Sequence, residues 1–264
     1  MEKIQSIRSV NLIGTGNVAW VLGTSLKDSG IEIRSVSGRN GLNRDELSNF
    51  LKCPSLALEE ILPSADLILL AVSDDAIAKV ASTLAQSNPK ERLIAHTSGS
   101  KATTLLEPFT NRASFYPLQT MTKGNIVNFK AVPFCVYATD STDQKALQAL
   151  AGKISDVVHL LDDQQRATLH LSAVLVNNFA NLFFTEAHRL SKSNNIDFEL
   201  LRPLITKTAQ KASKNDPATV QTGPAARKDL DTISQHLAML ENDPQLQELY
   251  KLVSERIIKN ADSK

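Results

Sequence analysis

Short apolar runs alternate with amphipathic segments along residues 1–161. Continuous apolar runs are typical of parallel strands buried on both faces, and a 3.6-residue apolar period is typical of helices. Strands are expected at 10–13, 31–36, 66–72, 92–96, 113–116, 133–138 and 157–161. Helical segments are expected at 17–27, 44–51, 75–84, 101–106 and 142–153. This alternation predicts a doubly wound α/β domain.

The pattern changes at Asp162, after which segments of helical period follow one another to the C-terminus. Residues 164–193 form a long, largely apolar segment, which predicts a central helix. We therefore expect two domains, an α/β domain over 1–161 and an all-helical domain over 162–264.

Two prolines indicate helix geometry in the second domain. A helix that starts after Asp197 meets Pro203 in its interior, where the missing N–H predicts a kink. Asp243 and Pro244 form an N-cap followed by proline at the first helical position, which predicts a last helix through Ile258.

A glycine-rich turn follows the first predicted strand and reads Gly14-Thr15-Gly16-Asn17-Val18-Ala19. Gly14 lets the chain leave the strand sharply, and Gly16 lets the backbone approach a pyrophosphate. The helix that starts at Asn17 directs its unpaired N–H groups at phosphate. We interpret Gly14, Thr15, Gly16, Asn17 and Val18 as the dinucleotide cradle of a Rossmann domain. The alternative is a turn that binds nothing.

The second predicted strand ends in Ser37-Gly38-Arg39-Asn40. An acidic residue there would bind the ribose hydroxyls of NAD, whereas an arginine accommodates the 2′-phosphate of NADP. No carboxylate is present, and Ser37, Arg39 and Asn40 offer charge and hydrogen bonds. The sequence therefore predicts NADP, with a solvated loop arginine as the alternative.

Residues just after parallel strands line the cleft in this topology. We assign Val72, Ser73 and Asp74, which follow the third strand, to the cofactor. After the strand that ends at His96, Ser98 is placed to hydrogen-bond nicotinamide or substrate, or else it only caps a helix start.

A polar stripe marks one face of the long apolar helix. At 100° per residue, its members share one side; they are His170, Val174, Asn177, Asn181 and His188. A cleft facing a ligand would satisfy these groups, and His170 can take or give a proton near neutral pH. The alternative is a face turned to a second subunit or to solvent, where we expect His188.

Charge and cysteine content narrow the possible partners. The 264 residues include 29 basic and 28 acidic side chains, a net charge of +1, so no broad cationic field favours nucleic acid or an anionic membrane. Cys53 and Cys135 are isolated, which predicts no metal site and fits a reducing cytosol. No signal peptide or apolar run of about 20 residues is apparent, so we expect a cytoplasmic protein.

The whole chain resembles a family with an NADP-binding Rossmann-like domain joined to a C-terminal helical domain of unknown function. The matching segments are Gly14 to Ala19, Ser37 to Asn40, Ala71 to Asp74, His96 to Gly99, Tyr116 to Thr120, His170 with Asn177-Asn178, and Thr222 to Asp229 with His236-Leu237. The architecture is similar to that of 6-phosphogluconate dehydrogenase, prephenate dehydrogenase, pyrroline-carboxylate reductase and the deazaflavin-dependent NADP reductases. The resemblance implies a nicotinamide cofactor and an unidentified substrate.

Three positions depart from these relatives. Val174 stands where β-hydroxyacid dehydrogenases carry a catalytic lysine, which argues against hydroxyacid oxidation. Tyr116 stands where prephenate dehydrogenases carry a histidine; with a reference pKa of about 10 it can donate a hydrogen bond but is a poor base. Lys228 stands where the family usually has glycine after Arg227.

These observations predict an NADP(H)-dependent oxidoreductase acting on a small polar substrate between the Rossmann edge and the long helix. Ser98 and His170 are the expected hydrogen-bonding or acid–base groups, and Asn177 or Tyr116 would orient the substrate. A non-catalytic NADP(H)-binding sensor or scaffold is the alternative, supported by the missing lysine.

We also expect a homodimer through the helical domain, because the segment 164–193 is apolar on more than one face. Such a pairing could bring Arg227 toward the partner's cleft. Alternatively, Arg227 only pairs locally with Asp229 or Asp231.

Overall fold

A computed structural model describes residues 6–125 and 127–262. Contacts group the chain into two units, Met1–Leu182 and Phe183–Lys264. The change from mixed to helical structure comes earlier, between the strand β8 (Val158–Leu160) and the helix α5 (Asp163–Ala173). The first unit therefore contains the sheet and the start of the long helix. The expected division into domains at 161/162 stays a prediction.

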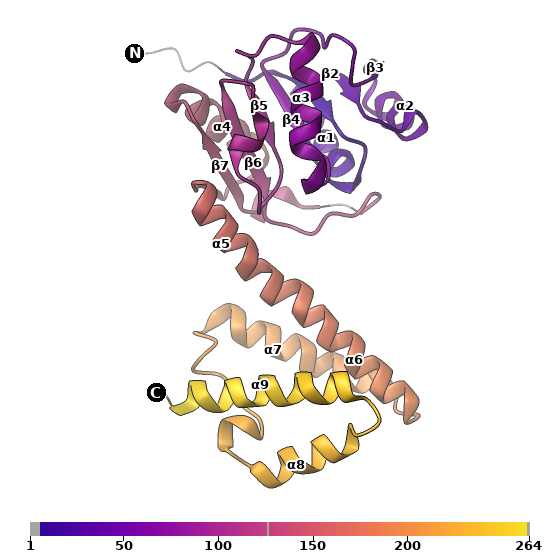
Figure 1. The fold of residues 1–264 in the computed structure, drawn as a ribbon, viewed down its shortest axis with the longest axis vertical. Helices are drawn as coiled ribbons and strands as arrows, with labels where there is room; N and C mark the ends of the chain where they lie inside the picture. Colours follow the sequence, from indigo (N-terminus) through magenta and orange to yellow (C-terminus); the bar gives the residue numbers. More distant parts are fainter. Residues whose placement is uncertain (1–5, 126, 263–264) are drawn as a thin grey trace. The chain divides into compact units, whose positions relative to one another are not determined.

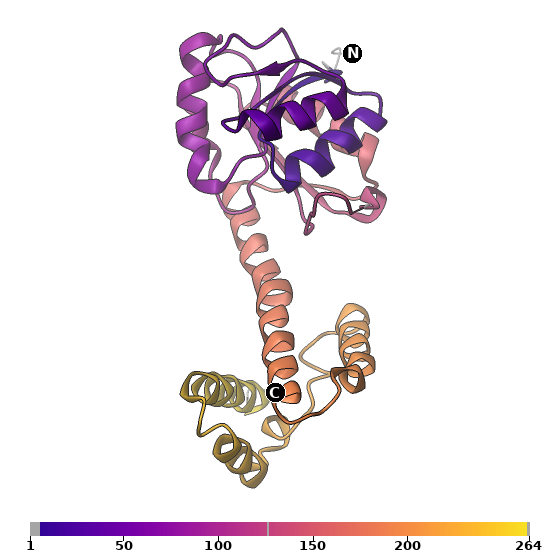
Figure 2. The same cartoon turned by 90° about the vertical axis from the view of Figure 1, so that its right-hand side faces the viewer.

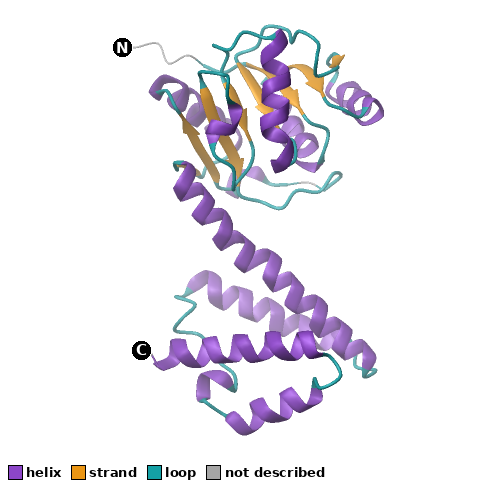
Figure 3. Ribbon diagram, in the orientation of Figure 1, coloured by secondary structure: helices purple, strands orange, loops and turns teal. Residues whose placement is uncertain are grey.

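An eight-stranded sheet forms the centre of the first unit (Figures 1 and 3). Its order is β3-β2-β1-β4-β5-β6-β7-β8, with β1 Ser9–Ile13, β2 Glu32–Ser37, β3 Ser55–Leu56, β4 Leu67–Leu70, β5 Ile94–His96, β6 Arg112–Pro117 and β7 Phe134–Ala138. Neighbouring strands are parallel except β6 and β7, which are antiparallel. The order reverses between β1 and β4, where ligand clefts form in such sheets. The predicted doubly wound fold is confirmed.

Helices cover both faces of this sheet (Figure 2). They are α1 Asn17–Asp28, α2 Gly41–Leu51, α3 Ile77–Ser87 and α4 Ser141–Ile154. Leu12 and Leu69 pack in the apolar layer of α1, α2 and α4, whereas Ile13 and Leu70 pack in the layer of α3. Because successive side chains of a strand point to opposite faces, burial on both sides requires a continuous apolar run.

Short 3₁₀ turns complete the first unit at Asp74–Ala76, Thr103–Leu106 and Phe129–Ala131. The helix expected at 101–106 is therefore wrong: the segment forms one 3₁₀ turn. The strand β3 has two residues and is too short to leave an apolar pattern in the sequence.

The long helix contains a π-helical segment. It runs as α5, then the π-helix Val174–Phe179, then α6 (Ala180–Ser193). A π-helix has a wider turn than an α-helix, so a constant angle of 100° per residue does not hold across this segment. The predicted stripe from His170 to His188 is therefore wrong as a single helical face.

The rest of the second unit is helical, with α7 Arg202–Lys214, α8 Leu230–Met239 and α9 Pro244–Asp262, and 3₁₀ turns at Phe198–Leu201 and Ala225–Arg227. Pro203 lies in the first turn of α7, where its missing N–H would have no partner within the helix, so the predicted kink is wrong. The predicted cap is confirmed, because Asp243 Oδ1 accepts a hydrogen bond from the Leu246 N–H at 3.1 Å.

Among the described residues, one helix, Asp163–Ser193, is long and apolar enough to cross a membrane by length and composition. This corrects the expectation that no such run exists. The segment nevertheless carries His170, Asn177 and Asn178, and polar side chains are costly in a hydrocarbon layer. A helix covered by protein passes the same test, so this feature is weak support for a membrane span.

Candidate active site

The glycine turn lies at the carboxyl end of β1, beside β2 and β4. Gly14 has φ +123°, its N–H donates to the Ser37 carbonyl at 2.8 Å, and an added Cβ would lie 2.1 Å from the Ala71 carbonyl oxygen. Only glycine fits this crossing point. Gly16 differs, because an added Cβ there would meet no protein atom within 4 Å. Its lack of a side chain therefore leaves open space in front of α1.

The first turn of α1 has neither a side-chain cap nor an acidic residue. Unpaired N–H groups at a helix start suit an anion. A cavity of about 220 Å³ lies here. Its lining includes Gly14, Thr15, Gly16, Arg39, Asn40, Val72 and Ser73 of the predicted cofactor residues. Asn17, Val18, Ser37 and Asp74 do not line this cavity; Asn17 Oδ1 instead accepts the Lys123 N–H at 3.0 Å.

The end of β2 presents a buried hydroxyl and an exposed arginine. Ser37 Oγ is buried and has no hydrogen-bond partner within 6–125 and 127–262, whereas Arg39 is exposed. Asn40 caps α2 by accepting the Asn43 N–H at 3.0 Å. The sequence did not single out Arg44, which donates to the Gly38 carbonyl at 3.3 Å and so holds this loop.

A hydrogen bond joins the loops that follow β4 and β5. The Ser100 hydroxyl donates to Asp74 Oδ2 at 2.7 Å. Both loops follow the carboxyl ends of neighbouring parallel strands. Asp74 therefore connects the cofactor side of this edge with the loop that contains Ser98.

Tyr116 and His170 form the central polar contact of the site. The Tyr116 hydroxyl lies 3.1 Å from His170 Nδ1, and the two rings meet edge to face at 6.0 Å. Burial raises the pKa of Tyr116 to about 12, so the phenol keeps its proton. The hydroxyl can donate to an unprotonated Nδ1 or accept from an Nδ1–H, so the tautomer of His170 decides the direction of this hydrogen bond.

Gly99 makes this contact possible. A Cβ at residue 99 would lie 2.6 Å from His170 Nδ1 and 2.7 Å from Tyr116 Cζ. Both rings therefore pack directly against the backbone of the loop after β5, and any side chain at residue 99 would displace them.

Ser98 is a buried residue of that loop, and its hydroxyl oxygen accepts N–H groups of Ser100 and Lys101 at 3.2 and 3.1 Å. These contacts are those of a local cap. Its N–H donates to His96 Nδ1 at 3.2 Å. Burial, with the nearby charge of Arg166, lowers the pKa of His96 to about 4, so this imidazole is neutral. A role for Ser98 toward substrate stays a prediction.

Arg166 is the main residue that sequence reasoning missed. It is fully buried in the first turns of α5 and donates to the Ser98 carbonyl at 3.1 Å and the Ser114 hydroxyl at 2.7 Å. It also contacts the Lys101 carbonyl and pairs with Asp163 at 2.8 Å. Although burial opposes ionisation of Asp163, hydrogen bonds from Thr103 and Arg166 hold its pKa below the usual value. The signal available in the sequence was Asp163 and Arg166 three residues apart at the start of an apolar helix.

Asn177 lies in the π-helical segment, and its amide donates to the Thr120 hydroxyl at 3.3 Å. Tyr116, His170 and Asn177 line one cleft of about 440 Å³ within the first unit. The structure thus brings together three of the four predicted catalytic residues along this cleft, while Ser98 supports the loop behind them.

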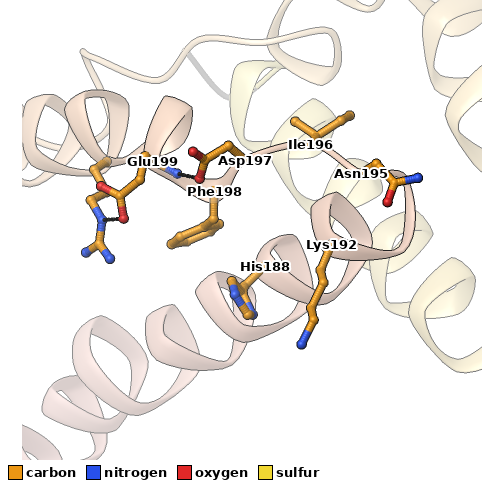
Figure 4. Close-up of a pocket in the computed structure, with 8 residues that line it drawn as sticks. His188, Lys192, Asn195, Ile196, Asp197, Phe198 and Glu199 are labelled. Carbon is orange, nitrogen blue, oxygen red and sulfur yellow. Dashed lines mark hydrogen bonds and ion pairs between the residues drawn. The ribbon is translucent and has the colours of Figure 1, made fainter.

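His188 belongs to the second unit. Its ring meets that of Phe198 edge to face at 5.1 Å, in a pocket that also includes Lys192 and Glu199 (Figure 4). Arg227 ends a 3₁₀ turn in the same unit, and its charge helps to lower the pKa of Asp229, after the Thr232 hydrogen bonds. Lys228 has φ +58°, a left-handed conformation that glycine adopts without strain.

Two family models match the sequence, a Rossmann-like domain over residues 2–120 and a domain of unknown function, DUF2520, over residues 132–257. A solved protein of Bacteroides fragilis, provisionally named an NADP oxidoreductase, is 36% identical over 97% of this chain and 100% of its own, with a TM-score of 0.87. The chain belongs to this family of Rossmann-like proteins with a DUF2520 domain. The resemblance stated from the sequence is confirmed.

More distant structures share the fold of this family. A protein of Thermotoga maritima is 21% identical over 96% of this chain and 98% of its own, with a TM-score of 0.75. A reductive aminase of Aspergillus terreus, in complex with NADPH and ethyl levulinate, is 16% identical over 97% of this chain and 94% of its own, with a TM-score of 0.71. Comparison with curated protein sequences finds no significant match.

Proposed function

We propose that this protein is an NADP(H)-dependent oxidoreductase that acts on a small polar substrate beside Tyr116 and His170. The observation that carries the proposal is the Tyr116–His170 hydrogen bond, at the same sheet edge as the glycine turn. Reduction of a double bond needs a proton donor near the reacting atoms. Nucleotide binding alone requires no such pair.

The residues of the glycine turn fit NADP. The open space before Gly16 and the uncapped start of α1 suit a pyrophosphate. Arg39, which lines the cavity at the glycine turn and is exposed, offers a positive charge to a 2′-phosphate, whereas Ser37 Oγ is buried without a hydrogen-bond partner among the described residues. The related protein of Bacteroides fragilis is provisionally named an NADP oxidoreductase, which supports the same cofactor. NADPH, when bound, supplies the hydride.

The protein groups position the substrate and its proton. When His170 carries a proton on both ring nitrogens, the Tyr116 hydroxyl accepts the Nδ1–H and holds the ring in place. The Nε2 proton can then pass to the oxygen or nitrogen of the group being reduced, which leaves a neutral imidazole. The Asn177 amide orients the substrate, and Ser98 keeps the loop after β5 in place.

Val174 favours the second candidate, a sensor or scaffold that binds NADP(H) without turnover. It lines the cleft at the position of the lysine in β-hydroxyacid dehydrogenases. Val174 argues only against hydroxyacid oxidation, because Tyr116 and His170 offer a different proton donor.

A titration followed by a turnover assay separates the two candidates. NADPH binding is measured first, and its oxidation is then followed with a panel of imines, 2-oxo acids and enals. We expect turnover that His170→Ala reduces by about 10²-fold or more, with His188→Ala in the second unit as the control. Tight binding without turnover would select the sensor.

The homodimer and the cytoplasmic location are part of the same proposal. Leu171, Leu175 and Phe179 are 61%, 54% and 50% exposed on the long helix, and an apolar surface of this kind favours burial by a second copy. The free thiols of Cys53 and Cys135 fit a reducing compartment. A mass near one chain in light scattering at micromolar concentration would overturn the dimer. If Arg227 reaches the partner's cleft, mixing Arg227→Ala and His170→Ala subunits should restore activity.

A further inference from the structure

The cleft beside Tyr116 and His170 is lined by groups without a fixed charge. Its polar side chains include Gln119, Thr120, Ser172 and Asn177, and its apolar ones include Leu118, Leu169, Val174 and Val176. Among the described residues of the first unit, no lysine, arginine, aspartate or glutamate lines it. Such a surface can hydrogen-bond a substrate but cannot neutralise an anion.

Within the first unit, the charged residues near the cleft offer no cation to a ligand there. Arg166 is fully buried and directed at Ser98, Ser114 and Asp163. Lys101 belongs to the loop after β5 but does not line the cleft. Asp74, whose charge adds to the effect of burial on Tyr116, is negative. The charge of Arg166 acts on Tyr116 in the opposite direction, but its hydrogen bonds are directed at protein partners, so it offers no direct ion pair to a ligand.

The uncharged lining of the cleft determines which chemical groups it can bind. A carboxylate moved from water into this cleft would lose its hydration without gaining a positive partner, which is unfavourable. A carbonyl oxygen or imine nitrogen needs only a hydrogen bond, which His170 and Asn177 can give, while the apolar wall suits a hydrocarbon flank.

We infer that the cleft selects a carbonyl compound or imine with no carboxylate in the part that the cleft encloses. The inference rests on the proposed function and narrows its substrate class. In the reaction the C=O or C=N carbon gains the hydride of NADPH and the heteroatom gains the proton of His170. The products are NADP⁺ and an alcohol or amine, and His170 recovers its proton from solvent.

A matched pair of ketones tests the inference. Ethyl levulinate and levulinate share one ketone, and the charge of the acid lies far enough from it to leave intrinsic reactivity similar. We expect kcat/KM to be at least about tenfold higher for the ester. If the acid is equally good or better, the inference is wrong.

Variants with an added cation provide a second test of the inference. Val174→Arg places a guanidinium in the lining and should shift the ester-to-acid ratio toward the acid by about tenfold or more. Thr168→Arg is the control on the same helix, because Thr168 is exposed and does not line the cleft. Val176→Arg, at an exposed position of the lining, replaces Val174→Arg if that variant does not fold. A ratio unchanged by the added cation would overturn the inference.

Binding measurements separate failure of this inference from failure of the proposed function. NADPH affinity is titrated independently, and ligand-detected NMR measures the ester and the acid on the NADP⁺ complex. If NADPH binds and the acid then binds as tightly as the ester or more tightly, the inference fails and the proposed function stands. If NADPH binds but neither ketone does, the cleft is not the substrate site, and the inference fails together with the substrate site of the proposed function. If NADPH does not bind, the proposed function fails and the inference with it.

Discussion

The glycine turn and the substrate cleft occupy the same edge of one sheet but are built differently. At the glycine turn, backbone geometry decides the shape: Gly14 is required by its neighbour Ala71, and the open space before Gly16 is left for a ligand. In the cleft, side chains decide: Tyr116 and His170 come from a strand and a helix 54 residues apart. Damage to the first should therefore act on cofactor binding or folding, and damage to the second on turnover.

The largest effect is expected from Gly14→Ala. Its Cβ would lie 2.1 Å from the Ala71 carbonyl oxygen at φ +123°, so we expect a loss of about 3–5 kcal/mol in the free energy of unfolding. Gly16→Ala is the matched control, with no protein atom within 4 Å of its Cβ. That variant should lose about 1 kcal/mol at most while binding NADPH more weakly. Urea unfolding and NADPH titration measure the two effects, and equal destabilisation by both variants would contradict this account.

Arg166→Leu should have the next largest effect. It leaves Asp163 without its cation and the Ser98 carbonyl and Ser114 hydroxyl without their donor, at an expected cost of about 2–4 kcal/mol in stability. Because these partners lie around the cleft, turnover should fall more than NADPH affinity does. Arg189→Leu, at a solvent-exposed ion pair in the second unit, is the control and should cost much less. A larger loss of NADPH affinity than of turnover would assign Arg166 to the cofactor side instead.

A pH effect of comparable size should come from His96. Its pKa is about 4 in the folded protein against 6.5 for an ordinary histidine, so between these values the unfolded chain binds a proton that the folded one does not. Stability should therefore fall as pH drops from 6.5 to 4, by about 1.4 kcal/mol per pH unit and about 3 kcal/mol in all. Urea unfolding at several pH values measures the slope. His96→Gln should remove most of this dependence, and an unchanged slope in that variant would assign it to other groups.

The smallest expected effect concerns the choice of cofactor. Arg39→Ala should weaken NADPH binding by about 1.5–3 kcal/mol while hardly altering NADH, because only NADPH carries the 2′-phosphate. Arg34→Ala, at an exposed ion pair with Glu32 on β2, is the control. Equal losses of binding free energy for the two cofactors would contradict the assignment of Arg39 to the 2′-phosphate.

Structural features that depend on residues close together in the sequence could be predicted from it. The strand, turn and helix around Gly14 depend on neighbours in the chain, and so does the Asp243 cap. Pro203 shows the limit of such reasoning: proline fits a helix start as well as it disrupts a helix interior, and the start of α7 at Arg202 decided between them.

The cleft depends on partners that are distant in sequence. Burial of Arg166 is possible only because acceptors at Ser98, Lys101 and Ser114 surround it, and no local sequence pattern predicts these contacts. The sequence marks Gly99 only as the end of the segment His96 to Gly99, whereas its role is set by two rings that come from other elements. The π-helical segment likewise leaves no apolar period of its own, so the angular position of residues after Val174 could not be predicted.

The buried arginine also bears on how such proteins can be recombined. A chain cut at the end of β8 would keep every strand but lose Arg166. The Ser98 carbonyl and the Ser114 hydroxyl would then lose their hydrogen-bond donor and line an empty space. The stability of the sheet therefore depends on the first turns of α5. A working chimera that exchanges helical parts between relatives should have its crossover near Leu182, beyond the last residue that lines the cleft.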